Sequence, residues 1–297
     1  MPSVFSVKKT DGMWVVPDKM NFPADAGTVS ATLNGMADLE ASAQKTQRED
    51  WMKLLDLAAP EEDHSRAVRI VLSDAQAKPM ASLLVGKSDT TTDTEGRPAI
   101  YVRRSDEKVV WLARGYLTAR RDIGDWLDKN VVPLTREQVQ ETDITPQSGP
   151  AYVVKRDSKT APNFILADVP KGRAVNYESA PDGVATALVG FAFVDLKPVG
   201  DVDFKKTTNL VTKTFDGLVI TTKIAGTDKD PEHWAMIMVT ADKPEAQAAA
   251  SAISGKVMGW AFKLPEYKAS VFLTTRESLL RPLPGQTVTP TTTQLPR

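Results

Sequence analysis

The chain has 297 residues, of which 41% are hydrophobic and 25% charged, and its formal net charge is −1. This length is enough for two domains of about 150 residues each. The balance of charges excludes a general electrostatic attraction to nucleic acid or to an anionic membrane. The chain contains no cysteine, which excludes disulfides and thiolate metal sites.

The first half of the sequence predicts a hairpin, a helix and a set of strands. Strands are expected at 4–9 and 13–16, because the intervening Thr-Asp-Gly favours a tight turn. Asp25 precedes apolar residues at helical spacing, a pattern typical of a capped helix start. The segment EDWMKLLDL at 49–57 predicts a short helical turn. The strands that follow are expected near 68–72, 81–85, 99–103 and 109–112.

Four segments of the first half recur in the same order in the second half. Tyr101 to Leu112 aligns without a gap on Phe262 to Leu273. The other similar pairs are VFSVKK from Val4 with AYVVKR from Ala151, VSATLNGMADL from Val29 with VATALVGFAFV from Val184, and VRIVL from Val68 with LVITT from Leu218. We therefore expect the second half to repeat the first. Its helix is expected at 182–194, and its strands near 151–156, 163–166, 217–223, 233–240, 260–264 and 270–274.

These patterns predict an α+β fold of two tandem related modules, each a mainly antiparallel sheet with one principal helix. The modules are placed at residues 1–135 and 136–283, and the Pro/Thr-rich residues 284–297 are expected to form a disordered tail. If the modules superpose, Tyr101 lies on Phe262 and Trp111 on Phe272, all four in cores.

A further expectation concerns the start of each module. Residues 142–145 form a short predicted strand before the second hairpin, and nothing equivalent precedes the first. We expect the equivalent strand to lie upstream of residue 1, so that 4–9 has fewer backbone partners than 151–156.

The order of GMWVV, LNGMADL, LLVGK and AIYVRRSDEKVVWL resembles a bacterial domain of unknown function numbered 4340. The resemblance extends from Val4 to about Pro282 and rests on packing and turn positions. It implies an extracytoplasmic protein held by an N-terminal membrane anchor and associated with ABC-type export components of the gliding-motility kind. It brings no catalytic residues with it.

Motifs for catalysis are weak. ASLLVGKS ends like a phosphate-binding loop with Lys87, but Ala81 replaces the first glycine and no helix is expected to follow. His64 and His233 are the only histidines, too few for a usual catalytic zinc site. Two carboxylate pairs, Asp125 with Asp128 and Asp228 with Asp230, are expected by chance in a chain this acidic. No metal, cofactor or catalytic residue is therefore predicted.

One cluster offers a candidate binding site. Arg114, Arg120 and Arg121 lie close together in sequence with Tyr116 among them, and their guanidinium groups suit a phosphate or carboxylate. The alternative is that these arginines belong to an ordinary charged helix face exposed to solvent.

We expect a non-enzymatic extracytoplasmic protein-interaction module, the soluble part of an envelope-associated ABC transport or gliding-motility-type assembly. The alternatives are a binding domain for a cell-surface glycan or small anionic ligand, and a hydrolase that uses the Asp pairs or His64. The sequence leaves the oligomeric state open.

Overall fold

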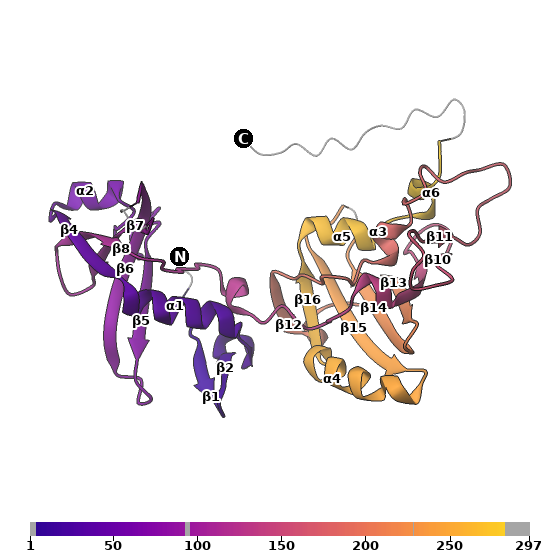
Figure 1. Cartoon of the computed structure of the whole chain (residues 1–297), viewed down its shortest axis with the longest axis horizontal. Helices are drawn as coiled ribbons and strands as arrows, with labels where there is room; N and C mark the ends of the chain where they lie inside the picture. The colour runs from indigo at the N-terminus through magenta and orange to yellow at the C-terminus, as the bar shows by residue number, and fades with distance from the viewer. Residues whose placement is uncertain (1–3, 93–95, 228, 283–297) are drawn as a thin grey trace. The chain divides into compact units, whose positions relative to one another are not determined.

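The computed structural model describes residues 4–92, 96–227 and 229–282. The chain divides into two compact units, Met1–Asp128 and Lys129–Arg297, which are described separately (Figure 1). Residues 129–135, expected at the end of the first module, belong to the second unit. The tail expected at 284–297 lies outside the described residues. Antiparallel sheets combined with separate helices make the fold α+β, as the sequence predicts.

Unit 1 contains two antiparallel sheets. The smaller has the order β1-β2-β3 and the larger the order β4-β8-β7-β6-β5. Helix α1 (Ala26–Asp38) begins at Asp25, whose Oδ1 accepts a hydrogen bond from the Thr28 amide at 2.6 Å. The other elements are β1 (Lys8–Thr10), β2 (Met13–Val16), η1 (Pro17–Lys19), β3 (Phe22–Pro23), β4 (Glu40–Thr46), α2 (Glu49–Leu54), β5 (Val68–Ser73), β6 (Pro79–Thr92), β7 (Pro98–Arg104), β8 (Val110–Arg114) and η2 (Ile123–Trp126).

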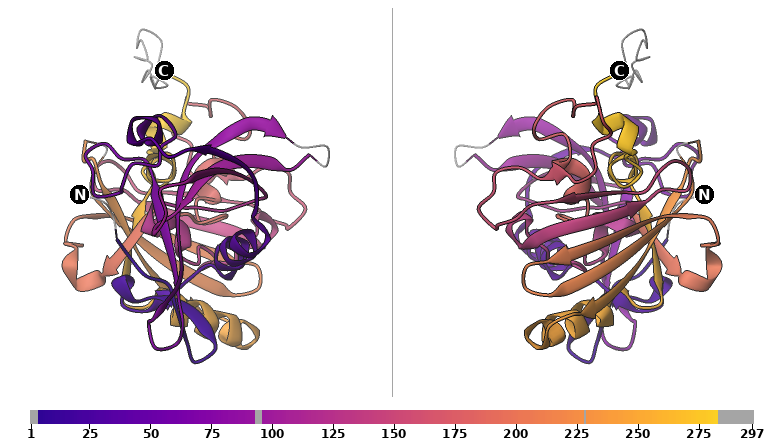
Figure 2. Two further views of the ribbon diagram at one scale, coloured as in Figure 1. Left: turned by 90° about the vertical axis from the view of Figure 1, so that its left-hand side faces the viewer. Right: turned by 90° about the vertical axis from the view of Figure 1, so that its right-hand side faces the viewer.

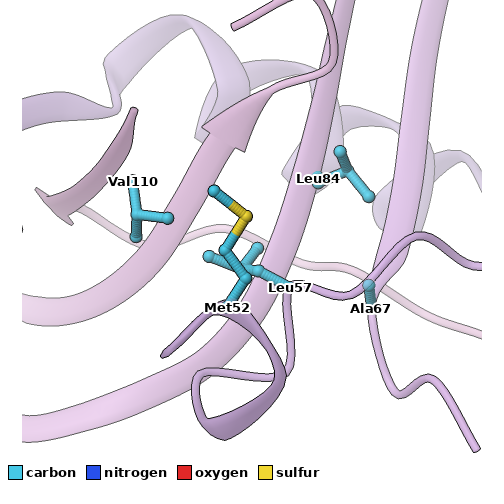
Figure 3. Packing of buried hydrophobic residues seen from close by; sticks show 5 residues of the cluster. All are labelled: Met52, Leu57, Ala67, Leu84 and Val110. Carbon is cyan, nitrogen blue, oxygen red and sulfur yellow. The ribbon is translucent and has the colours of Figure 1, made fainter. Parts of the chain in front are cut away.

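A buried cluster lies beneath α2 in unit 1. Met52 points from the helix toward Leu57 and Val110, and Leu84 and Ala67 complete the cluster (Figure 3). Leu57 and Val110 are 0% exposed. Burial of these side chains holds the short helix on the sheet, since six residues are too few for a stable isolated helix.

Unit 2 is built on one eight-stranded sheet of order β11-β10-β9-β13-β14-β15-β16-β12, in which every neighbouring pair is antiparallel. Two further views show its long orange strands side by side (Figure 2). The strands are β9 (Val139–Thr145), β10 (Tyr152–Lys155), β11 (Ile165–Leu166), β12 (Asp195–Pro198), β13 (Thr207–Thr214), β14 (Leu218–Ala225), β15 (His233–Ala241) and β16 (Trp260–Leu264). The helices are η3 (Arg136–Gln138), α3 (Asp182–Ala185), η4 (Val199–Asp201), η5 (Pro244–Ala246), α4 (Gln247–Val257), α5 (Glu266–Phe272) and α6 (Arg276–Leu279).

Aromatic rings form the centre of the unit 2 core. The Phe191 ring lies edge-on to that of Phe262, with centroids 5.7 Å apart, and Phe193 lies 4.9 Å from the same ring. Phe272 joins from α5, 6.4 Å from Phe191. Such edge contacts add to the free energy of burial.

Several expectations for individual elements are wrong, most of them in the second half. The expected helix at 182–194 is limited to the four residues of α3, and the expected strand at 270–274 lies mostly in α5, where Phe272 is buried on a helix face. Helix α4 and strands β4, β12 and β13 were not predicted. The strand expected at 4–9 begins only at Lys8, and that expected at 163–166 only at Ile165.

The two units nevertheless connect five strands in the same order. In unit 1 the order β4-β8-β7-β6-β5 places the first strand beside the last, and in unit 2 the order β12-β16-β15-β14-β13 does the same. By this order β7 corresponds to β15, and β8 to β16. The expected pairing of Tyr101 with Phe262 is therefore wrong by one strand. Tyr101 and Trp111 are also half-buried, whereas Phe262 and Phe272 are 0% exposed.

The cause of the error is an insertion. Helix α4 separates β15 from β16, whereas a short turn joins β7 to β8. A gap-free alignment cannot accommodate that helix, so it matches β7 with the strand that follows α4. No helix in the described ranges has the length and apolar character that a membrane span requires.

Candidate functional site

Helix α2 presents two large apolar side chains to solvent. Trp51 is 50% exposed and Leu54 67% exposed, and a spacing of three residues places them on the same side of the helix. Met52 faces the core instead. We call Trp51 and Leu54 the α2 patch.

Charged pairs border the α2 patch. Arg48 Nη2 lies 2.6 Å from Asp50 Oδ2, and Lys53 Nζ lies 3.2 Å from Glu62 Oε2. The hydrogen bond from Arg48 lowers the pKa of Asp50. An apolar centre with a polar rim is the composition of a protein-contact surface.

The three arginines of the candidate anion site lie in different settings. Arg114 ends β8, where its backbone pairs with Glu40 and Ala99. Arg120 and Arg121 are exposed in the segment that follows, and Arg121 Nη2 donates to the Ser65 carbonyl at 3.1 Å.

A pocket of about 190 Å³ lies beside the same segment, and none of the three arginines lines it. Its lining residues are Ser88, Pro98, Ala99, Ile100, Gly115, Tyr116, Leu117 and Thr118. Tyr116 is 72% exposed at its rim. The pocket is therefore lined by apolar residues, one aromatic residue and two hydroxyl residues, Ser88 and Thr118, rather than by clustered charge.

The segment around Lys87 is a strand rather than a phosphate-binding loop. Gly86 and Lys87 lie within β6, and the Lys87 amide donates to the Leu55 carbonyl at 3.1 Å. A Cβ on Gly86 would lie 2.2 Å from the Leu55 carbonyl oxygen. The glycine therefore allows the chain after α2 to pack against the sheet.

The histidines and carboxylate pairs are dispersed. His64 is exposed in a turn with φ 61°, whereas His233 is buried with a ring nitrogen 2.6 Å from the Thr227 carbonyl. Asp125 is exposed in η2, and Asp230 accepts a hydrogen bond from the Thr227 amide. Asp228 lies outside the described residues. Among the residues described, no group of three or more His, Asp and Glu side chains is placed to hold a metal ion.

Sequence reasoning missed a buried arginine in unit 2. Arg156 is 4% exposed, and its guanidinium donates to the carbonyls of Val139, Arg136, Lys159 and Ala161. The guanidinium carbon lies 4.7 Å from the centre of the Phe164 ring. Burial lowers the pKa of Arg156. Because its donors are directed to backbone carbonyls, the side chain ties three chain segments together, and no sequence motif marks such a role.

An ion triad on the sheet of unit 2 was also missed. Lys213 Nζ on β13 lies 2.7 Å from Glu141 Oε1 and 2.8 Å from Asp143 Oδ2, both on β9. Hydrogen bonds to Asp143 and Glu141 raise the pKa of Lys213. This face of the sheet therefore pairs a basic strand with an acidic one.

The fold and these sites define an α+β protein with an exposed apolar helix patch and dispersed ionisable groups. Residues 14–212 match the family described as a domain of unknown function, DUF4340, and the chain belongs to that family. No curated protein and no solved structure matches it. The matched range includes the α2 patch, the pocket and the two carboxylates of the triad, and it ends one residue before Lys213.

Proposed function

We propose that the protein is a non-enzymatic protein-interaction module, and that it forms the extracytoplasmic, soluble part of an envelope-associated ABC transport or gliding-motility-type assembly. The α2 patch carries the proposal of protein contact. The envelope and transport setting rests on the family resemblance.

The α2 patch supports protein contact for a physical reason. Two large apolar side chains remain half or more exposed although a buried cluster lies directly beneath the same helix. Tryptophan is among the residues most often found at the energetic centre of interfaces. The bordering ion pairs supply the polar rim that is usual around such a contact surface.

The test is co-purification of the native protein from membranes, with identification of ABC transporter subunits. The double variant Trp51→Ala, Leu54→Ala should lose those subunits. Met258→Ala, at 76% exposure, together with Tyr267→Ala, at 63%, is the matched control and should retain them. Equal recovery from both double variants, or recovery of no transporter subunit by the unaltered protein, contradicts the proposal.

A second candidate is a ligand-binding role, favoured by Tyr116 at the rim of the pocket. An exposed aromatic ring beside the hydroxyl residues Ser88 and Thr118 suits a sugar, whose apolar face can stack on the ring. Titration with cell-wall oligosaccharides should then show saturable binding that Tyr116→Ala abolishes. Binding that Tyr116→Ala leaves unchanged contradicts this candidate.

A further inference from the structure

Strand β5 is an unprotected sheet edge. In the described part of the chain β6 is its only strand partner, and the register is regular from Val68 to Leu72. The strand carries neither lysine nor proline, and its one charged side chain, Arg69, is paired with Glu61. Its outer backbone donors and acceptors are therefore a template for another strand.

The other sheet edges in the described ranges carry features that discourage pairing. Strand β4 has two register shifts and a lysine, β1 has two lysines, and β12 has a lysine and Pro198. Strands β3 and β11 have only two residues each. Natural proteins use short, bulged, lysine-bearing or proline-bearing edges to prevent unwanted pairing. The contrast distinguishes β5 as an edge suited to a partner.

Unit 2 shows what lies at the equivalent edge. There β13 corresponds to β5, and its outer side is paired with β9. Strand β9 also pairs with β10, the first strand of the hairpin, whose counterpart in unit 1 is β1. Within the residues that the structure describes, both β1 and β5 thus lack the neighbour that β9 supplies to their counterparts.

Burial along the two strands agrees with a vacant neighbour position. On β13, Leu210 and Thr212 are 0% and 2% exposed beside β9. On β5, Ile70 and Leu72 are only half-buried, and Val71 is 47% exposed. A strand added to β5 would bury this apolar surface and pair its free backbone groups.

The chemistry of the added strand follows from β9. Its Thr142 and Ile144 face the core, and the alternate residues Glu141 and Asp143 meet Lys213. On β5 the corresponding face carries Arg69, which is held by Glu61 in a solvent-accessible pair at 2.5 Å. Exposed pairs of this kind are weak, so an incoming carboxylate can share the guanidinium.

We propose that β5 binds an extended segment of a partner polypeptide in which apolar and acidic side chains alternate, added antiparallel as β9 is added to β13. Main-chain hydrogen bonds would supply affinity, and the alternating side chains would supply specificity. This inference rests on the proposed protein-interaction function and assigns to it a second contact surface, separate from the α2 patch.

The probe is a labelled synthetic peptide with the sequence of residues 137–146, EQVQETDITP, titrated against the full chain. Saturable binding is expected. The same peptide carrying Ile144→Pro should not bind, because proline removes a donor and disfavours pairing. The peptide with Glu141→Lys and Asp143→Lys should bind more weakly.

Variants of the protein locate the site. Val71→Asp places a carboxylate beside the acidic peptide and should weaken binding by about fivefold or more. Met238→Asp is the matched control on an interior strand, 43% exposed in the unaltered protein, and should leave binding unchanged. The double variant Trp51→Ala, Leu54→Ala should also leave peptide binding unchanged. A failure of this inference can therefore be distinguished from a failure of the proposed function.

Three results overturn the inference. The first is absence of saturable binding by the unmodified peptide. The second is equal binding by Val71→Asp and Met238→Asp, with both variants shown to be folded by circular dichroism. The third is a dimer of the unaltered chain that Val71→Asp dissociates, because β5 would then bind a second copy of the chain rather than a partner polypeptide.

Discussion

The two units connect five strands in the same order, but they differ in one bordering strand. In unit 2, β9 lies between the hairpin and the five-strand set and joins them into one eight-stranded sheet. In unit 1 the hairpin sheet and the five-stranded sheet remain separate. A single strand therefore decides whether the same set of connections gives one sheet or two, because each strand supplies backbone partners on both of its sides.

The cores differ as well. Unit 2 packs four phenylalanine rings together, those of Phe191, Phe193, Phe262 and Phe272, whereas the buried cluster beneath α2 in unit 1 is built from smaller side chains. The two units should therefore respond differently to substitutions at positions that look alike in sequence.

The largest expected effect tests the mistaken pairing of Tyr101 with Phe262. Phe262→Ala should lower the free energy of unfolding of unit 2 by about 4 kcal/mol, because it leaves a cavity among packed rings. Tyr101→Ala should cost unit 1 about 1 to 2 kcal/mol, since that side chain is half-buried. Urea denaturation followed by near-ultraviolet circular dichroism measures both. Equal losses of the free energy of unfolding would instead support the alignment of Tyr101 with Phe262.

The next effect concerns the close approach in unit 1. Gly86→Ala should destabilise unit 1 by about 3 kcal/mol, because the new Cβ would overlap the Leu55 carbonyl oxygen. Gly255→Ala, on α4 with no neighbouring atom within 4 Å, is the control and should be neutral or slightly stabilising. Thermal denaturation of the two variants gives the comparison. A neutral Gly86→Ala would show that the chain after α2 does not pack as described.

Amide hydrogen exchange sharpens the contrast between β5 and β13. Alternate amides of β5 face no strand of the described ranges and should exchange about 30-fold faster than those of β13, a difference of about 2 kcal/mol in protection. Mass spectrometry of overlapping peptides measures this difference. Saturation with the peptide of residues 137–146 should slow β5 and leave β13 unchanged. Equal protection of the two strands in the free protein would contradict the open edge.

The smallest effect distinguishes the two hairpins. Tyr152 on β10 is buried and donates to the Thr274 carbonyl at 2.5 Å, whereas the residues of β1 are all exposed. Tyr152→Phe should cost about 1 kcal/mol, the net worth of the hydrogen bond. A matched change in β1, Thr10→Val, should cost less.

The same tyrosine gives a pH dependence. Burial raises the pKa of Tyr152 above its ordinary value of 10.0. Because the folded-state pKa is the higher one, the stabilisation is fully present below pH 10 and is lost as the pH rises toward the folded-state pKa. Denaturation between neutral and strongly alkaline pH should show this loss in the unaltered protein and a smaller one in Tyr152→Phe. Identical alkaline profiles would show that Tyr152 ionises freely in the folded state.

Local chemistry in the sequence determined the features that depend on a few neighbouring residues. Asp25 supplies a hydrogen-bond acceptor for a helix start whatever the rest of the chain does, and Thr-Asp-Gly favours the first hairpin turn. The short polar connections between the strands from β5 to β8 likewise predicted antiparallel pairing. The α2 segment was predicted as helix, but exposure of Trp51 and Leu54 is visible only in the folded unit.

Long-range packing decided the rest. A short apolar run such as ASVFL suits a buried strand and a buried helix face equally, and contacts with Phe191 select the helix. Strands β4 and β12 contain few apolar residues. They form because the last strand of each five-strand set, β8 or β16, offers its open backbone edge as a partner. The residues of β5 do not by themselves indicate a free edge, because that edge depends on the absence of a neighbouring strand in the described part of the chain. Backbone pairing joins segments far apart in the chain, so only the tertiary structure reveals which edges it leaves open.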